Sequence, residues 1–281
     1  MRVRGVARES ARISPTAYFT AQAWHKEGFP NAELFDTRTG RLLFGTAMRA
    51  LALLARHAPS LAWHEQFLYI RHYAYEERLR QLAPDFIIEV GAGLSPRGLT
   101  FSSANPRMVY VEVDLPNLVA EKRRRLSRAD VPRNFHLYSG DVLREGFFES
   151  LPVRPDRGMH VVVVSEGVAD YFDRAQKRRA WASIATFLSQ YENGRYLFEA
   201  YTRERLRKYP VTASVALAGL SALVGRPMER QLLSNAEEVV DLACSAGFGR
   251  IETLDLATLN VSRHQPPLDY RHFDLFEARV A

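Results

Sequence analysis

Two stretches of the sequence constrain the fold more than any others. FIIEVGAGLSPRG, residues 86–98, is an apolar run that stops at a Gly-x-Gly turn, and VYVEVDLP, residues 109–116, is a second apolar run that ends in carboxylates. Strands of this kind pair in parallel, so their carboxyl ends meet at one edge of a sheet. The two stretches therefore predict an α/β chain with a nucleoside-sized pocket at that edge.

The remaining pattern extends this core in both directions. Apolar residues at three- and four-residue spacings predict helices within 14–27, 37–58 and 62–82. From residue 85 onward, short β-type runs alternate with helical ones, and runs such as VVVV lack the in-out alternation of a half-exposed strand. We predict a Rossmann-like α/β fold with a seven-stranded, mostly parallel sheet that has one antiparallel member.

The same pattern predicts how the chain is divided. A helical N-terminal cap is expected over residues 1–84, followed by a ligand-binding core over residues 85–281. The core is interrupted by a helical insertion at about 203–233, near the C-terminal strands. We find no internal repeat and no Pro- or Ser-rich linker, so one domain with a cap and an insertion is the simplest description.

The Gly-x-Gly turn at Gly91 and Gly93 lets the backbone approach a ligand closely, because glycine adopts angles closed to other residues and has no side chain. A dinucleotide fingerprint would place a third glycine at position 96, where this chain has Pro96. Proline suits the first turn of a helix instead. Pro96 thus disfavours a pyrophosphate site and a dinucleotide-dependent oxidoreductase. By itself, the Gly-x-Gly sequence is also compatible with a strand-to-helix turn that binds no ligand.

Acids follow three of the predicted strands. Asp114 ends the second strand at the spacing expected for a carboxylate that binds both ribose hydroxyls, with Glu112 two residues earlier on the same face. After the third strand, Asp141 is placed to accept from an adenine amino group and Val142 to supply an apolar wall. Glu166 follows four valines, where burial without a partner is costly, which favours a ligand-facing role. The alternatives are a solvent-facing acid for Asp114 and a turn aspartate for Asp141.

Composition narrows the setting of the protein. The formal charge of +6 fits an anionic small molecule as well as a nucleic acid, and the run EKRRRLSR at 121–128 is expected to be a solvated helix face because no aromatics are interleaved. Cys244 is the single cysteine, which excludes an intrachain disulfide; we expect a buried structural thiol and a cytoplasmic location. No secretory signal is seen in the first fourteen residues, and the apolar stretch at 213–225 is too short to span a bilayer.

Several motifs in order, GAGLSPR, VEVDLP, GDVL, SEGVADYF and the leading SPTAYFTAQAWHKEGFPNAELFDTRTGRLL, resemble those of the leucine carboxyl methyltransferase family, which includes bacterial polyketide O-methyltransferases. The resemblance covers roughly residues 14–255. It implies a class I fold that binds S-adenosylmethionine. By the same matching, the site residues would be Arg71 for the methionine carboxylate, Gly91 for the methionyl part, Asp114 for the ribose, Asp141 and Val142 for the adenine, and Glu166 for the methionine amino group. Gly93 of the same turn is a further candidate for cofactor binding.

The chain departs from that family in one motif. Members usually carry Asp-Thr-Arg after the glycine turn, whereas this chain has Ser95, Pro96 and Arg97. The acid is lost and the arginine is kept. The insertion, RERLRKYPVTASVALAGLSALVGRPMER, carries no match that names a substrate.

These observations lead to a predicted S-adenosylmethionine-dependent O-methyltransferase that acts on a carboxylate or hydroxyl of a small molecule or peptide, without a metal, a nucleic acid or a membrane as partner. A carboxylate acceptor is already ionised and needs cations to hold it, whereas a phenolic one needs a base. The alternatives are a cofactor-binding module without turnover and a protein C-terminal carboxyl methyltransferase. The weak catalytic candidates are Tyr201 and His72, with His136 as a further histidine and Arg203, Arg205, Arg207 and Lys208 as candidate cations.

Overall fold

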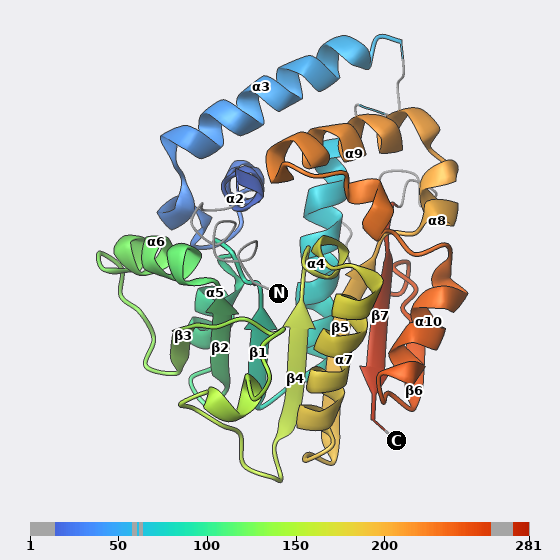
Figure 1. Ribbon diagram of the computed structural model, residues 1–281. Helices are drawn as coiled ribbons and strands as arrows, with labels where there is room; N and C mark the ends of the chain where they lie inside the picture. Colours follow the sequence, from blue (N-terminus) through green and yellow to red (C-terminus); the bar gives the residue numbers. More distant parts are fainter. Residues whose placement is uncertain (1–14, 58–60, 62–63, 260–271, 281) are drawn as a thin grey trace, which may run out of the picture.

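The computed structural model describes residues 15–57, 61, 64–259 and 272–280 of the chain. Its centre is a seven-stranded sheet with the order β3-β2-β1-β4-β5-β7-β6 (Figure 1). Parallel pairing joins β3 through β5, and β7 pairs antiparallel with both β5 and β6. The strands are β1 (Phe86–Val90), β2 (Val109–Asp114), β3 (Phe135–Ser139), β4 (His160–Ser165), β5 (Asn193–Ala200), β6 (Arg250–Thr253) and β7 (Asp274–Arg279). The predicted fold class is confirmed.

Helices cover both faces of the sheet because every central strand is buried on both sides. One hydrophobic cluster joins alternate strand residues such as Ile87 and Val162 to α2, α4 and α5. The other joins the residues between them, such as Ile88 and Val163, to α7 and α10. The helices are α2 (Pro15–Glu27), α3 (Arg38–Leu54), α4 (His64–Leu82), α5 (Arg97–Ala104), α6 (Pro116–Leu126), α7 (Arg174–Leu188), α8 (Arg203–Arg207), α9 (Pro210–Val224) and α10 (Ala236–Ser245).

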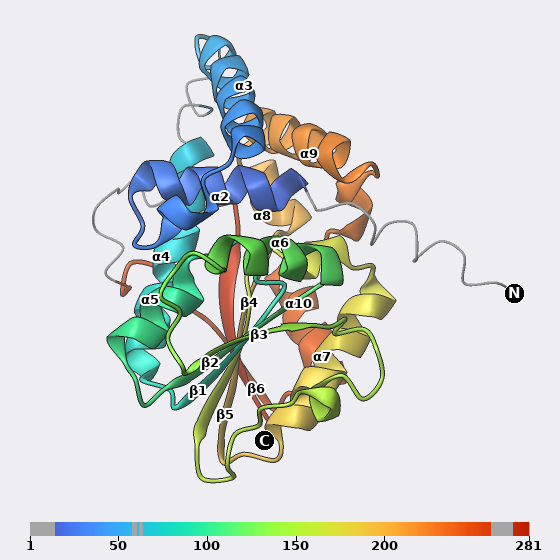
Figure 2. The ribbon, with the colours of Figure 1, turned by 90° about the vertical axis from the view of Figure 1, so that its left-hand side faces the viewer.

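The carboxyl ends of the parallel strands point toward α2, α3, α6 and α9, which lie together at one end of the molecule (Figures 1 and 2). Helix α2 contacts α3, α4 and α9, so the predicted cap and the predicted insertion meet above this edge of the sheet. The division at residue 84 stays a prediction, since α4 shares a hydrophobic cluster with the strands. Within the described residues, no helix is long and apolar enough to cross a membrane.

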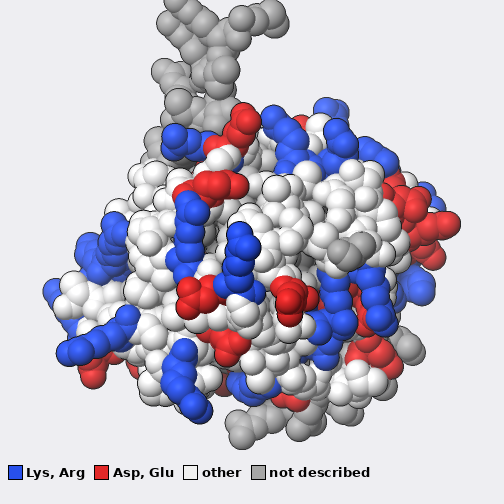
Figure 3. All heavy atoms as spheres, turned by 90° about the horizontal axis from the view of Figure 1, so that it is seen from below, with Lys and Arg blue, Asp and Glu red and all other residues white. Residues whose placement is uncertain are grey.

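The opposite end of the molecule carries charges of both signs. Figure 3 views this end, where the parallel strands begin, and shows Lys and Arg side chains interspersed with Asp and Glu. On the face in view, the formal excess of +6 is therefore not gathered into one basic patch.

The expectation of a buried Cys244 is wrong, because the thiol is exposed. Helix α10 buries Val239, Leu242 and Ala243, which follow its helical period, and Cys244 falls about 100° further round the axis. The apolar composition of this stretch therefore led to the wrong prediction, because Cys244 lies on the exposed face of the helix.

The basic run on α6 is only partly a solvated face. Lys122 is 1% exposed, donates to the Ser95 carbonyl oxygen at 2.7 Å and pairs with the buried carboxylate of Glu112. Burial raises the pKa of Glu112 to about 7, against the opposing effect of the Lys122 ammonium. One ammonium therefore joins α6, β2 and the segment that follows the glycine turn.

Gly98 makes room for this pair, and its replacement provides a test. A Cβ at Gly98 would collide with the Glu112 carboxylate and would lie 2.7 Å from Phe135. Gly98→Ala is expected to lower the free energy of unfolding by about 1–3 kcal/mol through overpacking. Urea denaturation measures the change. Gly219→Ala is the matched control, because Gly219 lies in α9 with open space around its Cβ position; equal losses in both variants would contradict the prediction.

Candidate functional site

The turn after β1 has the backbone that its glycines predict. Gly91 and Gly93 have φ angles of 70° and 54°, in the left-handed region that favours glycine. A Cβ at Gly91 would collide with the side chain of Val168, which belongs to the loop after β4. The glycine therefore lets two loops at the carboxyl edge of the sheet touch.

Asp114 closes this turn from the neighbouring strand. Its Oδ2 accepts from the Gly93 amide at 2.6 Å, and its Oδ1 accepts from the Leu115 amide at 2.7 Å. Burial raises the pKa of Asp114, and the two amide donors partly offset that rise. Each carboxylate oxygen keeps a second lone pair, so two ligand hydroxyls can still donate to this residue.

Asp141 and Val142 lie at the end of β3, beside β2. Asp141 is partly buried and accepts from the Leu143 amide at 2.9 Å, as a turn aspartate does. Val142 is 6% exposed and packs in the cluster that contains Val90 and Val113. The structure thus places an acid and an apolar side chain at the next strand end along the edge that holds Asp114.

Glu166 is held by two arginines and a histidine rather than lying open. Its Oε1 accepts from Arg71 Nε at 3.0 Å, and its Oε2 lies 3.0 Å from His72 Nδ1 and pairs with Arg97. The Glu166 side chain is 4% exposed, and those of His72 and Arg97 are 0% exposed. Arg97, His72 and Arg71 together hold the pKa of Glu166 well below its usual range, although burial alone would raise it.

Arg97 links this acid to the first strand. It donates to Glu89 at 2.9 Å, and Glu89 also accepts from the hydroxyl of Tyr110 on β2. Glu89 lies inside the buried strand FIIEV, and this charged residue among apolar ones was the sequence signal for a partner. Sequence reasoning recorded Arg97 as kept but did not find this role.

Arg71 reaches the same cluster from α4. Besides Glu166, its guanidinium donates to the hydroxyl of Tyr201 at 2.7 Å and lies 3.9 Å from Glu199. Burial raises the pKa of Tyr201, although Arg71 opposes the rise, so this hydroxyl keeps its proton near neutral pH. The structure therefore brings Arg71, His72, Glu166 and Tyr201 together, with both weak catalytic candidates acting as partners of the ionic cluster.

Glu199 and Tyr75 are site residues that sequence reasoning missed. Glu199 lies near the end of β5, and its carboxyl accepts from the Gly167 amide and meets the hydroxyl of Tyr75 from α4. Burial raises the pKa of Glu199 to about 7, with Arg71 opposing and Glu166 reinforcing the rise. The signal was again a glutamate in an apolar strand, within YLFEAY.

The cations of the insertion do not join this cluster. Arg205 pairs with Asp274 on β7, its Nε lying 3.2 Å from the carboxylate. Arg203, Arg207 and Lys208 are exposed. Their position on and after α8 favours the solvated helix face over a role in holding an acceptor.

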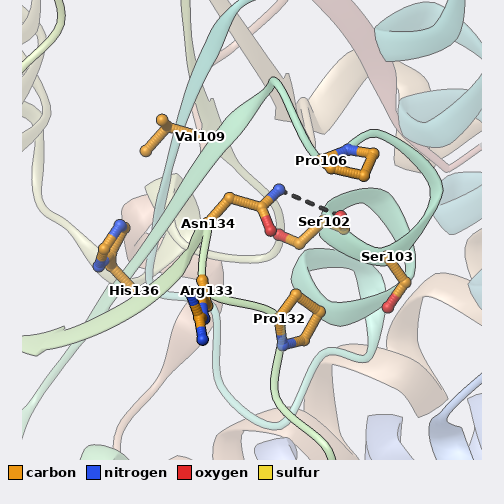
Figure 4. A pocket seen from close by; sticks show the side chains of 8 residues that line it. All are labelled: Ser102, Ser103, Pro106, Val109, Pro132, Arg133, Asn134 and His136. Atoms are coloured by element: carbon orange, nitrogen blue, oxygen red, sulfur yellow. Dashed lines mark hydrogen bonds between the residues drawn. The ribbon is translucent and has the colours of Figure 1, made fainter.

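His136 lies far from the site, at the other end of the parallel strands. It lines a hollow of about 570 Å³ between the end of α5 and the starts of β2 and β3 (Figure 4). Partial burial lowers the pKa of His136. Asn134 in the same hollow donates to the carbonyl oxygens of Ser102, Asn105 and Met108, which fixes the α5–β2 connection. This histidine is therefore not positioned to act at the carboxyl edge.

Comparison with known proteins shows the fold. No protein-family model matches the chain, and no curated protein matches it in sequence. A proposed methyltransferase from Thermobifida fusca aligns with 99% of this chain and 99% of its own, with a TM-score of 0.64 and 14% identity. A DUF574 family protein from Streptomyces avermitilis aligns with 96% and 100%, with a TM-score of 0.64 and 13% identity.

A third similar structure is PigF with SAH, with a TM-score of 0.53 and 15% identity. It aligns with 84% of this chain, which spans 66% of the length of PigF. The chain thus shares the fold of these proteins. Among the residues that the structure describes, no group of three or more His, Cys, Asp or Glu side chains is arranged to hold a metal ion.

Because Arg97 is buried against Glu89 and Glu166, replacing it is expected to lower the stability of the fold strongly. Arg97→Met would leave Glu89 and Glu166 short of a cation in a fully buried site. Removing one partner of a buried ion pair typically costs about 3–5 kcal/mol of unfolding free energy. Urea denaturation at pH 7 measures this loss. Arg124→Met, which breaks an exposed pair with Glu121, serves as the control with little expected change; similar values for both variants would show that the cluster does not stabilise the fold.

Proposed function

We propose that the protein is an S-adenosylmethionine-dependent O-methyltransferase that acts on a small molecule or peptide. The observation that carries the proposal is the Asp114 carboxylate bonded to the amide of Gly93 at the carboxyl edge of the sheet. A glycine turn and an acid in this arrangement suit a nucleoside. The sequence resemblance supports the same cofactor, as do the similar structures described as a methyltransferase and as PigF with SAH.

The residues present fit this cofactor. Asp114 would accept from the ribose hydroxyls, and Asp141 and Val142 would meet the adenine. Nη2 of Arg71 makes no hydrogen bond with the described residues, so it suits the methionine carboxylate. Oε1 of Glu166 accepts from Arg71 Nε, so its second lone pair can accept from the methionine amino group.

When bound, S-adenosylmethionine would supply a methyl group on a sulfonium for transfer to an acceptor oxygen. The chain must align that oxygen and exclude water. Tyr201 keeps its proton, and His72 is fully buried against Glu166, so neither is poised to take a proton from a phenol. These two residues therefore supply no general base, and a carboxylate acceptor, which is already ionised near neutral pH, would need none.

A second candidate function is a cofactor-binding module without turnover. It is suggested by Ser95, which stands where members of the resembled family usually carry an aspartate. Ser95 replaces that acid with its own contacts: its carbonyl oxygen accepts from Lys122 and its hydroxyl accepts from the Arg97 amide at 3.2 Å. These bonds anchor the turn without a carboxylate, which supports a working site. Methyl transfer to candidate acceptors, detected by mass spectrometry with labelled cofactor, separates the candidates and also distinguishes a metabolite from a protein C-terminus.

Asp114 is the residue whose loss tests cofactor binding most directly. Asp114→Ala is expected to weaken S-adenosylmethionine binding by about 2 kcal/mol, roughly 30-fold in Kd, because two ribose hydrogen bonds are lost. Isothermal titration calorimetry measures this change. Asp130→Ala, at an exposed position after α6, is the control for removing one carboxylate. An unchanged affinity in Asp114→Ala would remove this residue from the site.

A further inference from the structure

Two hydrogen-bond acceptors, the Glu199 carboxyl group and the Ser165 carbonyl oxygen, compete for the single proton of the Tyr75 hydroxyl. The Tyr75 hydroxyl lies 2.8 Å from the Ser165 carbonyl oxygen and within hydrogen-bond reach of Glu199 Oε2. A tyrosine hydroxyl has one proton, and burial raises the pKa of Tyr75 so that it keeps it. If the Tyr75 hydroxyl donates to the Ser165 carbonyl oxygen, a hydrogen bond between Tyr75 and Glu199 requires that Glu199 is protonated and acts as the donor.

The charge balance around Glu199 leads to the same conclusion. Arg71 and Arg97 are matched by Glu166 and Glu89, which they contact directly. Glu199 is 2% exposed, and its nearest cation, Arg71, is 3.9 Å away. An ionised Glu199 would add a third carboxylate to the two guanidiniums of a buried site, which is costly.

We propose that Glu199 is a positioning residue that works as a neutral carboxylic acid, holding the Gly167 amide and leaving the charge of Arg71 for the carboxylate of a bound ligand. The inference rests on the proposed function, in which Arg71 binds the methionine carboxylate. Ionisation of Glu199 puts a second anion beside Arg71 and weakens that binding. Ligand binding and protonation of Glu199 therefore favour each other.

Charged and titratable groups face Glu199 from three parts of the chain. Helix α4 presents Arg71 and Tyr75, the loop after β4 presents Glu166, and β5 with the residue after it presents Tyr196 and Tyr201. The neighbouring residue on β7 is the apolar Leu275. Because burial raises the pKa of Glu199 to about 7, the acid is mostly protonated at pH 6 and mostly ionised at pH 8.

The test compares the native chain with Glu199→Gln, because a glutamine copies the neutral acid: its oxygen accepts from the Gly167 amide and its NH₂ donates to Tyr75. Calorimetry with S-adenosylhomocysteine from pH 6 to 8 is expected to show an affinity loss of about tenfold in the native chain and a nearly flat profile in Glu199→Gln. Glu145→Gln, at an exposed position, is the control and keeps the native profile.

A second readout needs no ligand. A carboxyl whose pKa is raised by folding loses stability as pH rises from its unfolded value toward its folded value, because the folded state binds more protons. The Tm of Glu199→Gln is therefore expected to exceed that of the native chain by several degrees at pH 7.5, with the difference closing toward pH 4.5.

Two results would overturn the proposal. One is a parallel pH dependence of Tm in the native chain and Glu199→Gln, which would mean that Glu199 is ionised throughout. The other is loss of binding at pH 6 in a folded Glu199→Gln, which would mean that the charge is required. A native chain that binds no S-adenosylhomocysteine at any pH would instead refute the proposed function and the role toward ligand, while the Tm comparison still decides the protonation of Glu199.

Discussion

The ionic cluster around Glu166 is the interaction on which the rest of the site depends. One carboxylate is shared by Arg71 from α4 and Arg97 at the start of α5. Taking such charges out of water is expensive, and the cost is recovered only when every partner is in place. The cluster therefore fixes the relative positions of α4, α5 and the loop after β4, and with them the glycine turn that Val168 touches.

The elements of the fold could be predicted from the sequence because their signals are local. Apolar runs without alternation predicted β1 and β4 close to their observed bounds, and helical spacing predicted α2 and α4. The predictions were wrong where the burial of a residue depends on tertiary packing. Cys244 and Lys122 lie in windows whose composition suits either face of a helix, and only the neighbouring elements determine which face is buried.

The candidate site could be predicted only in part, for the same reason. Acids at strand ends are visible in a sequence, so Asp114 and Glu166 were found, and the structure places them at one edge of the sheet. Glu89 and Glu199 are visible in the sequence only as charged residues inside apolar strands, and the sequence does not show which distant cations they meet. The helix α9 above this edge has no charged residue from Pro210 to Val224, so its side chains offer little chemistry by which to name an acceptor.

The sharing of Glu166 also bears on how the molecule assembles during synthesis. Arg71 and Arg97 precede their common partner by 95 and 69 residues, and Tyr201 lies 130 residues beyond Arg71. Contacts of such high sequence separation form late, after loop closure has been paid for. A ribosome-bound chain that has not yet emerged past β4 holds Arg71 and Arg97 without the Glu166 carboxylate that they share. A ligand would therefore bind and stabilise only chains in which this core has already folded.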